Sequence, residues 1–174
     1  EEGIHSLEKG RTFYSSNAGL MELREEISRK VESQHGISYN AKNEVMITVG
    51  GSEAIDLAMR VMILPGDEVL IPEPCYVSYL PCARMAYGVP VPIPLEEKDE
   101  FRLTAEKLEA AITEKSKLLI LPFPNNPTGS IMEKEDLEAI VPLILKHNLY
   151  VLTDEIYASL SYKGKHHSII EIPG

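Results

Sequence analysis

Two hydrophobic patterns alternate along the chain. Short runs rich in Val, Ile and Leu predict strands, and each is followed by a stretch whose apolar residues recur every three or four positions, which is typical of an amphipathic helix. The predicted strands are 45–49, 68–71, 89–95, 117–121 and 149–153. This alternation predicts an α/β fold of three layers, α/β/α, with a mostly parallel sheet between helices.

Capping residues and helix breakers set the predicted helix ends. The first long helix is expected to begin near Asn17, a good N-cap, and to end at Gly36. Ser52 is expected to cap a second helix, 53–64, whose side chains are apolar nearly all round and therefore predict deep burial. The remaining predicted helices are 79–85, 104–112 and 136–147. Prolines at every second position of the strand 89–95 predict that it lies at an edge of the sheet.

Composition and charge narrow the class of protein. The chain has 174 residues, 44% of them hydrophobic and 25% charged, which is typical of one globular domain. A net charge of −10 argues against nucleic acid as a partner, and no apolar run is long enough to span a membrane. Two cysteines without zinc-site spacing, and no signal peptide, lead us to expect a cytoplasmic protein without a metal site.

In parallel sheets, ligands bind at the carboxyl ends of the strands, so the residues that follow each strand are candidates for chemistry. Gly50, Gly51 and Ser52 follow the first predicted strand and lead into a helix. The backbone N–H groups and dipole of such a helix end favour an anion. The alternative is a tight turn followed by an ordinary N-cap.

Two further strand ends carry polar side chains. Residues 122–129 contain three prolines and two asparagines, which fix the backbone, allow a cis peptide bond before proline, and present Asn126 at the sheet edge. Asp154 follows an apolar strand, where an unpaired carboxylate is costly, so it needs a positive partner or several donors. Tyr157 is three residues further along and is expected on the same side as Asp154.

Five segments form a pattern that spans nearly the whole chain. They are Tyr14-Ser15-Ser16-Asn17-Ala18-Gly19 with Glu22-Leu23-Arg24, then Gly50-Gly51-Ser52-Glu53-Ala54, Pro74-Cys75-Tyr76-Val77-Ser78-Tyr79, Asn125-Asn126-Pro127-Thr128-Gly129 and Asp154-Glu155-Ile156-Tyr157. In their order and residues they resemble fold-type I pyridoxal-phosphate (PLP) enzymes, and more narrowly the class I/II aminotransferases of the aspartate aminotransferase family. The resemblance implies that the chain is the central part of the PLP-binding large domain.

The resemblance also implies a role for individual residues. A carboxylate beside the pyridinium nitrogen keeps it protonated, and the ring can then act as an electron sink. Tyr14 would act from the neighbouring subunit, which implies a homodimer. The implied contacts are the phosphate for Gly51, Ser52 and Tyr14, the ring face for Tyr76, the ring's 3-oxygen for Asn126 and Tyr157, and the pyridinium nitrogen for Asp154. The alternatives are a core aromatic at Tyr76 and a helix N-cap at Asp154.

One part of the family pattern has no match in the chain. The family's Schiff-base lysine follows the Asp–Tyr motif, so we expect it beyond Gly174, with the small C-terminal domain, and we expect the N-terminal arm before Glu1. Lys163 and Lys165 are expected in a solvated loop, with His166 and His167 on the surface. We therefore expect this chain to be inactive and to bind PLP at most non-covalently. Missing strands would leave a gap or exposed edges in the sheet.

The resemblance implies transfer of an amino group from an amino acid to a 2-oxo acid in a longer protein. Two alternatives use the same scaffold. One is a carbon–sulfur β-lyase, which would share the constellation of Asp154, Asn126 and Tyr157. The other is the non-catalytic, ligand-sensing domain of a transcription regulator.

Overall fold

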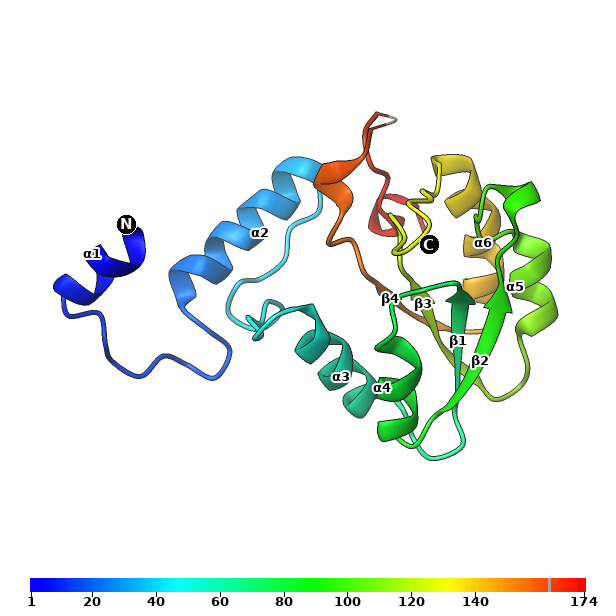
Figure 1. Cartoon of the computed structure of the whole chain (residues 1–174), viewed down its shortest axis with the longest axis horizontal. Helices are drawn as coiled ribbons and strands as arrows, with labels where there is room; N and C mark the ends of the chain where they lie inside the picture. The colour runs from blue at the N-terminus through cyan, green and yellow to red at the C-terminus, as the bar shows by residue number, and fades with distance from the viewer. Residues whose placement is uncertain (163) are drawn as a thin grey trace. The chain divides into compact units, whose positions relative to one another are not determined.

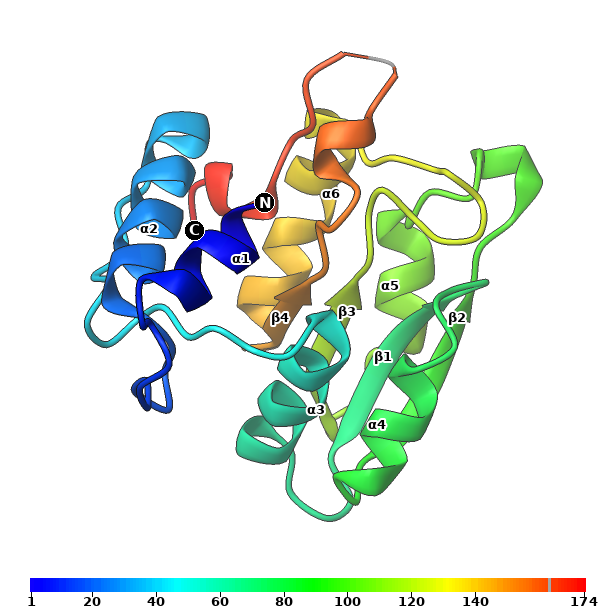
Figure 2. The same cartoon turned by 60° about the vertical axis from the view of Figure 1, so that its left-hand side comes forward.

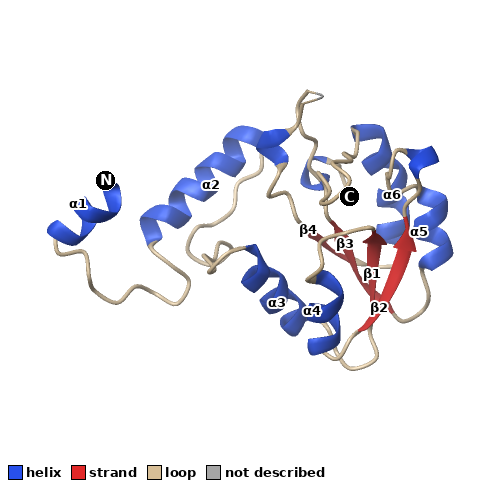
Figure 3. Ribbon diagram, in the orientation of Figure 1, coloured by secondary structure: helices blue, strands red, loops and turns tan. Residues whose placement is uncertain are grey.

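The computed structural model describes residues 1–162 and 164–174. Three helices come first, and from residue 51 to residue 153 α-helices and strands alternate (Figure 3). The strands are β1 (Glu68–Glu73), β2 (Val89–Pro94), β3 (Ser116–Leu121) and β4 (Tyr150–Thr153). The α-helices are α1 (Glu2–Glu8), α2 (Met21–His35), α3 (Gly51–Met62), α4 (Tyr79–Met85), α5 (Ala105–Ala111) and α6 (Lys134–Lys146). Short 3₁₀ turns are η1 (Glu97–Asp99), η2 (Ala158–Leu160) and η3 (Ile169–Glu171).

The chain divides into two compact units, Glu1–Thr48 and Val49–Gly174. In the first unit, α2 ends at Gly36, which has the left-handed φ of 73° that the sequence predicts. The predicted start near Asn17 is wrong, because Gly19 has a φ of 92° and its N–H closes a turn on Ser16. The helix therefore begins only at Met21. The short helix α1 has no buried residues, so no apolar stripe predicts it.

The predicted strand 45–49 does not form among the described residues. Within the first unit this segment is held by single contacts rather than by a neighbouring strand. The guanidinium of the buried Arg24 donates to the carbonyls of Lys42 (2.5 Å) and Val45 (2.9 Å), and Ile47 N–H donates to Ala18 O (3.0 Å). A strand needs a paired neighbour, and hydrophobic patterning alone cannot show whether one is present.

The second unit contains a four-stranded sheet in the order β2-β1-β3-β4, with every pair parallel, as the sequence predicts. Of the two outcomes that the sequence predicts, a gap or exposed edges, the described residues show the second, because the sheet is continuous and ends at β2 and β4. β2 lies at an edge, also as predicted. Val89 and Leu95 donate their N–H groups to Asp67 and Glu73, so the alternate prolines direct their nitrogens away from β1.

Side chains of the central strands alternate between two hydrophobic cores. Helices lie on both faces of the sheet (Figures 1 and 2), which confirms the three layers. Leu70 and Leu119 pack on one face with α5 and α6. Ile71 and Ile120 pack on the other face with α3 and α4. The parallel strands all have their carboxyl ends on the same side of the sheet. The candidate residues of the second unit lie at these strand ends.

Two expectations for the helix after Gly50 are wrong. Gly50, with a φ of 82°, is the N-cap of α3, and Ser52 lies inside the first turn without capping it. Deep burial is also wrong, because Ile55 and Met59 are buried but Val61 is 84% exposed. The sheet covers only one side of this outer-layer helix, so only one stripe of its apolar residues is buried.

The later helices agree more closely with the sequence. Thr104 caps α5 by accepting the N–H of Lys107 (3.4 Å), as predicted. α6 begins two residues before its predicted start at 136, because Glu133 and Asp136 form a reciprocal capping box. Within the described part of the chain, no helix is long and apolar enough to cross a membrane.

Candidate functional site

A cavity of about 190 Å³ lies at the carboxyl ends of β3 and β4. Six of the seven predicted site residues line it, from four separate segments of the second unit: Gly51, Ser52, Tyr76, Asn126, Asp154 and Tyr157. The seventh, Tyr14, lies in the first unit with a fully exposed side chain. Its action in a neighbouring subunit stays a prediction.

The N-terminus of α3 forms one wall of this cavity. Its first-turn N–H groups have no partners within the helix, and space around Gly51 is open enough that an added Cβ would meet nothing within 4 Å. Ser52 Oγ lies 3.2 Å from Tyr76 Oη, which joins the helix end to the neighbouring aromatic. Hydrogen bonds from Ser52 and Ser78 lower the pKa of Tyr76. This wall has the donors that an anion such as a phosphate requires.

Asp154, which follows β4, brings a carboxylate to the same cavity, in contrast to the hydrogen-bond donors at the N-terminus of α3. Its backbone N–H donates to Leu121 O (3.1 Å), which continues the ladder between β3 and β4. Its Oδ2 accepts from Tyr79 Oη at 2.9 Å and its Oδ1 accepts from Ile156 N–H at 3.3 Å. Of the two alternatives that the sequence predicts, a positive partner or several donors, the structure shows two donors.

Tyr79 is a site residue that the sequence analysis used only as part of a motif. It lies at the start of α4, is 2% exposed, and packs edge-to-face against Tyr76 with ring centroids 5.7 Å apart. Burial and the nearby Asp154 raise the pKa of Tyr79, so its hydroxyl stays protonated and donates. The donor requirement of Asp154 is the signal that could have pointed to a hydroxyl here.

Replacing Tyr79 by Phe is expected to lower the free energy of unfolding by about 1.5–3 kcal/mol, because the Asp154 carboxylate loses a donor. Urea unfolding of the variant checks this. Tyr76→Phe is the matched control and should change stability by less than about 0.5 kcal/mol, because its hydroxyl bonds only near the surface. Equal losses in the two variants would contradict the assignment.

The loop after β3 is held by hydrogen bonds between its own residues. Asn125 N–H donates to Ser130 O and Gly129 N–H donates to Asn125 O, both at 2.8 Å, while Thr128 Oγ1 donates to Asn125 Oδ1 at 3.0 Å. The peptide bonds before Pro124 and Pro127 are cis, as the sequence suggested. This loop leaves the Asn126 side chain exposed toward the cavity.

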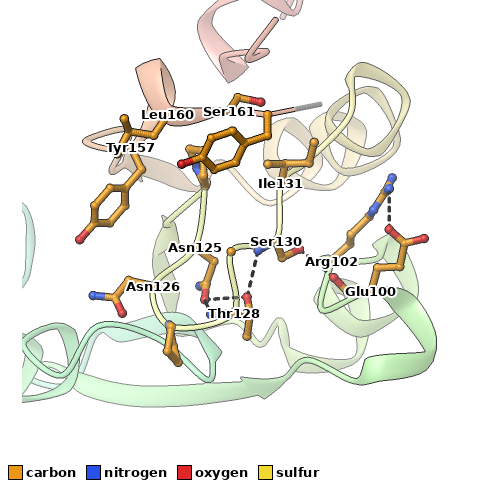
Figure 4. A pocket seen from close by; sticks show the side chains of 14 residues that line it. Glu100, Arg102, Asn125, Asn126, Thr128, Ser130, Ile131, Tyr157, Leu160 and Ser161 are labelled. Atoms are coloured by element: carbon orange, nitrogen blue, oxygen red, sulfur yellow. Dashed lines mark hydrogen bonds and ion pairs between the residues drawn. The ribbon is translucent and has the colours of Figure 1, made fainter. Parts of the chain in front are cut away.

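A second cavity, of about 630 Å³, adjoins the first and was not predicted (Figure 4). The two share Pro124, Asn126 and Tyr157 as lining residues. Asn126 and Tyr157 lie on one side of it, and Arg102, paired with Glu100 at 3.1 Å, lies on the other. A ligand in the first cavity would therefore have open space beside Asn126 and Tyr157.

The segment after Tyr157 differs from the expectation. The side chain of His166 is only 10% exposed and lies 3.2 Å from Glu155, so its predicted surface position is wrong. His167 is half-buried and lies 3.6 Å from Glu171. Lys165 is 63% exposed, as expected of a solvated loop, and pairs with Glu171 at 3.1 Å. Lys163 lies outside the described residues.

The pH dependence of the free energy of unfolding tests whether folding lowers the pKa of Glu155. Burial raises its pKa, but the nearby His166 and the hydrogen bond from Ser168 outweigh this and hold the pKa below its usual value. The stabilisation is therefore complete above the unfolded-chain pKa of about 4.3 and is lost as the pH falls through the folded-state pKa. The stability difference between the wild type and Glu155→Gln should be largest above pH 5 and should vanish in acid, as measured by urea unfolding. A difference independent of pH would contradict this.

Comparison with known proteins places this geometry in a family. Residues 1–172 match the family described as "Aminotransferase class I and II". A relative from Bacillus subtilis, "Putative aminotransferase YugH", is 47% identical over the whole chain, and an "Aromatic-amino-acid aminotransferase 2" from Thermococcus litoralis is 42% identical. The chain spans about 45% of the length of each.

Solved structures agree with the sequence relatives. An aromatic aminotransferase from Pyrococcus horikoshii OT3 superposes with a TM-score of 0.96 over 98% of this chain and 46% of its own, at 41% identity. An aspartate aminotransferase from Thermus thermophilus, with maleate, gives a TM-score of 0.92 at 38% identity over 97% of this chain and 44% of its own. The match spans the cavity and the sheet that supports it, and the chain belongs to the class I and II aminotransferases.

Proposed function

We propose that this chain forms the PLP-binding part of an aminotransferase that moves an amino group from an amino acid to a 2-oxo acid. The observation that supports this best is the single cavity that joins the N-terminus of α3 to the doubly hydrogen-bonded carboxylate of Asp154. One end suits a phosphate and the other a protonated ring nitrogen. PLP carries both groups on one small ring.

The residues around the cavity fit PLP by their chemistry. Backbone N–H groups at Gly51, where a Cβ would meet open space, and the Ser52 hydroxyl are suited to the phosphate. Tyr76 supplies an aromatic face, and Asn126 and Tyr157 supply polar groups for the ring's 3-oxygen. When bound, PLP supplies an electron sink for the carbanion that forms at the amino acid's α-carbon.

The chain's own residues set the charge and the order of the site. Tyr79 and the backbone of Ile156 hold the Asp154 carboxylate in one orientation. A carboxylate held in this way would keep the ring nitrogen of bound PLP protonated. The second cavity offers room for an amino-acid substrate beside Asn126 and Tyr157. The relatives' names make aspartate and aromatic amino acids the first substrates to test.

Several features of the whole enzyme are part of this proposal. The chain spans less than half of its relatives, so the Schiff-base lysine and the small domain are assigned to segments outside it. A homodimer would bring Tyr14 of one subunit to the phosphate of the other. We also propose a cytoplasmic location.

The alternatives have less support. The relatives that the comparisons name are aminotransferases, which favours amino-group transfer over a carbon–sulfur β-lyase and over a non-catalytic sensor domain. The three differ in product: a transferase needs a 2-oxo acid acceptor, a β-lyase releases ammonia without one, and a sensor does neither.

The test is an assay of a protein that carries these 174 residues together with the segments its relatives have beyond them. With PLP, aspartate or phenylalanine and 2-oxoglutarate, we expect glutamate to form only when both substrates are present. Ammonia release without 2-oxoglutarate would instead support the lyase. PLP binding without any turnover of these or other amino acids would support the sensor.

A further inference from the structure

Glu155 stands between two of the proposed cofactor residues but does not share their cavity. Asp154 and Tyr157 line the cavity, whereas the Glu155 carboxylate lies among Thr153, His166 and Ser168. Its side chain is only 20% exposed. A carboxylate buried to this extent is costly unless donors surround it, so its position calls for an explanation.

Both oxygens of this carboxylate are engaged. Oε1 accepts from Ser168 Oγ at 2.6 Å and from Thr153 Oγ1 at 3.0 Å. Oε2 lies 3.2 Å from His166 Nε2. Hydrogen bonds to a charged acceptor are among the stronger ones in proteins, so the bond from Ser168, together with the close approach of His166, holds the end of β4 against the segment 166–171.

Ser168, which donates to the Glu155 carboxylate, is itself held in place by hydrogen bonds. Ser168 is 1% exposed, its Oγ accepts the N–H of Ile170 at 3.4 Å, and its carbonyl accepts the N–H of Glu171 at 3.0 Å. The Glu155 backbone carbonyl accepts the N–H of Ala158 at 2.9 Å. Glu155 therefore contacts the segment 166–171 through its side chain and closes the turn 155–158 through its backbone carbonyl.

We propose that Glu155 is a positioning residue that sets the places of Asp154 and Tyr157 in the PLP site through Ser168 and His166. The expected effect of Glu155 on PLP binding rests on the proposed function, whereas its expected effect on the structure around Asp154 and Tyr157 does not. The neighbouring carboxylate of Glu171 pairs with Lys165 and His167. Glu171 therefore offers a matched control within the same segment.

The first measurement needs no cofactor. Hydrogen exchange of the 174-residue chain is compared between the wild type, Glu155→Gln and Glu171→Gln. We expect the amides of Asp154 and Ala158 to exchange about tenfold faster in Glu155→Gln, because its local opening loses one strong hydrogen bond. Unchanged exchange at both amides would overturn the structural part of the proposal.

The second measurement titrates PLP into the same proteins, followed by PLP fluorescence. We expect the Kd of Glu155→Gln to rise about tenfold, and that of Glu171→Gln to stay within about twofold of the wild type. Faster exchange with an unchanged Kd would overturn the positioning role. If the wild type does not bind PLP, the proposed function fails, while the exchange result still decides the structural role.

A second variant tests the proposal if Glu155→Gln does not fold. Ser168→Ala removes one donor and keeps the carboxylate, so it replaces Glu155→Gln if circular dichroism shows loss of structure. It should raise the Kd for PLP about threefold, as expected for one hydrogen bond of modest net strength. A Kd equal to that of the wild type would count against the proposal.

Discussion

Asp154→Asn is expected to weaken PLP binding by this chain about 10- to 100-fold, since a hydrogen bond to a charged group contributes about 1.5–3 kcal/mol. The substitution keeps the size of the side chain but removes the charge that would keep the ring nitrogen protonated. It also removes one acceptor, because Tyr79 Oη and Ile156 N–H donate to different oxygens of Asp154, and the substitution replaces one of these oxygens by an NH2 group. Titration with PLP, followed by fluorescence, measures the change.

The control for this prediction neutralises a carboxylate of similar size elsewhere. Asp56 pairs with Arg60 one turn further along α3 at 2.8 Å, and neither lines the cavity. Asp56→Asn should leave the Kd for PLP within about twofold of the wild type. In the longer protein, Asp154→Asn should reduce amino-group transfer at least as much as it reduces binding. Equal affinities for Asp154→Asn and the wild type would contradict the assigned role of the carboxylate.

Leu119→Ala is expected to lower the free energy of unfolding by about 2–5 kcal/mol, the largest stability effect that we predict. Leu119 lies in the centre of β3, between Leu70 on β1 and Val151 on β4, and is fully buried. Its side chain belongs to the core shared with α5 and α6, so its loss leaves a cavity that the parallel strands on either side cannot close.

Urea unfolding of the variant and of Val61→Ala tests this effect. Val61 is 84% exposed on α3, so its truncation should change stability by less than about 0.5 kcal/mol. A small loss at Leu119 would mean that β3 is not the centre of the sheet. Such a result would also remove the support for the strand ends that carry Asn126 and Asp154.

Several elements could be predicted from local sequence because local forces decide them. The buried strands, the proline-rich edge strand β2 and the caps at Gly36 and Thr104 all follow from side-chain patterning or backbone geometry. The segment 45–49 has the same apolar pattern but forms no strand among the described residues, because pairing is a property of the neighbour.

The candidate site shows the same division. Asn126 and Asp154 can be predicted because each follows a strand, and the parallel sheet brings strand ends together. Gly51 lines the same cavity although the strand predicted before it does not form in the described part of the chain, because its position depends on the helix that it begins. Tyr79 is missed as an individual site residue because its contact with Asp154 joins positions 75 residues apart in sequence. His166 was wrongly placed on the surface, because polar flanking residues do not reveal a buried carboxylate partner.

The most direct test of the central claim is chemical-shift mapping of PLP binding on the isotopically labelled 174-residue chain. We predict saturable changes at the backbone amides of Gly51, Ser52, Asn126 and Asp154, with smaller changes at the α3 amides when pyridoxal without phosphate is used. Absence of saturable shifts, or shifts confined to the side of the second cavity that carries Arg102, would contradict the assignment of this cavity to PLP.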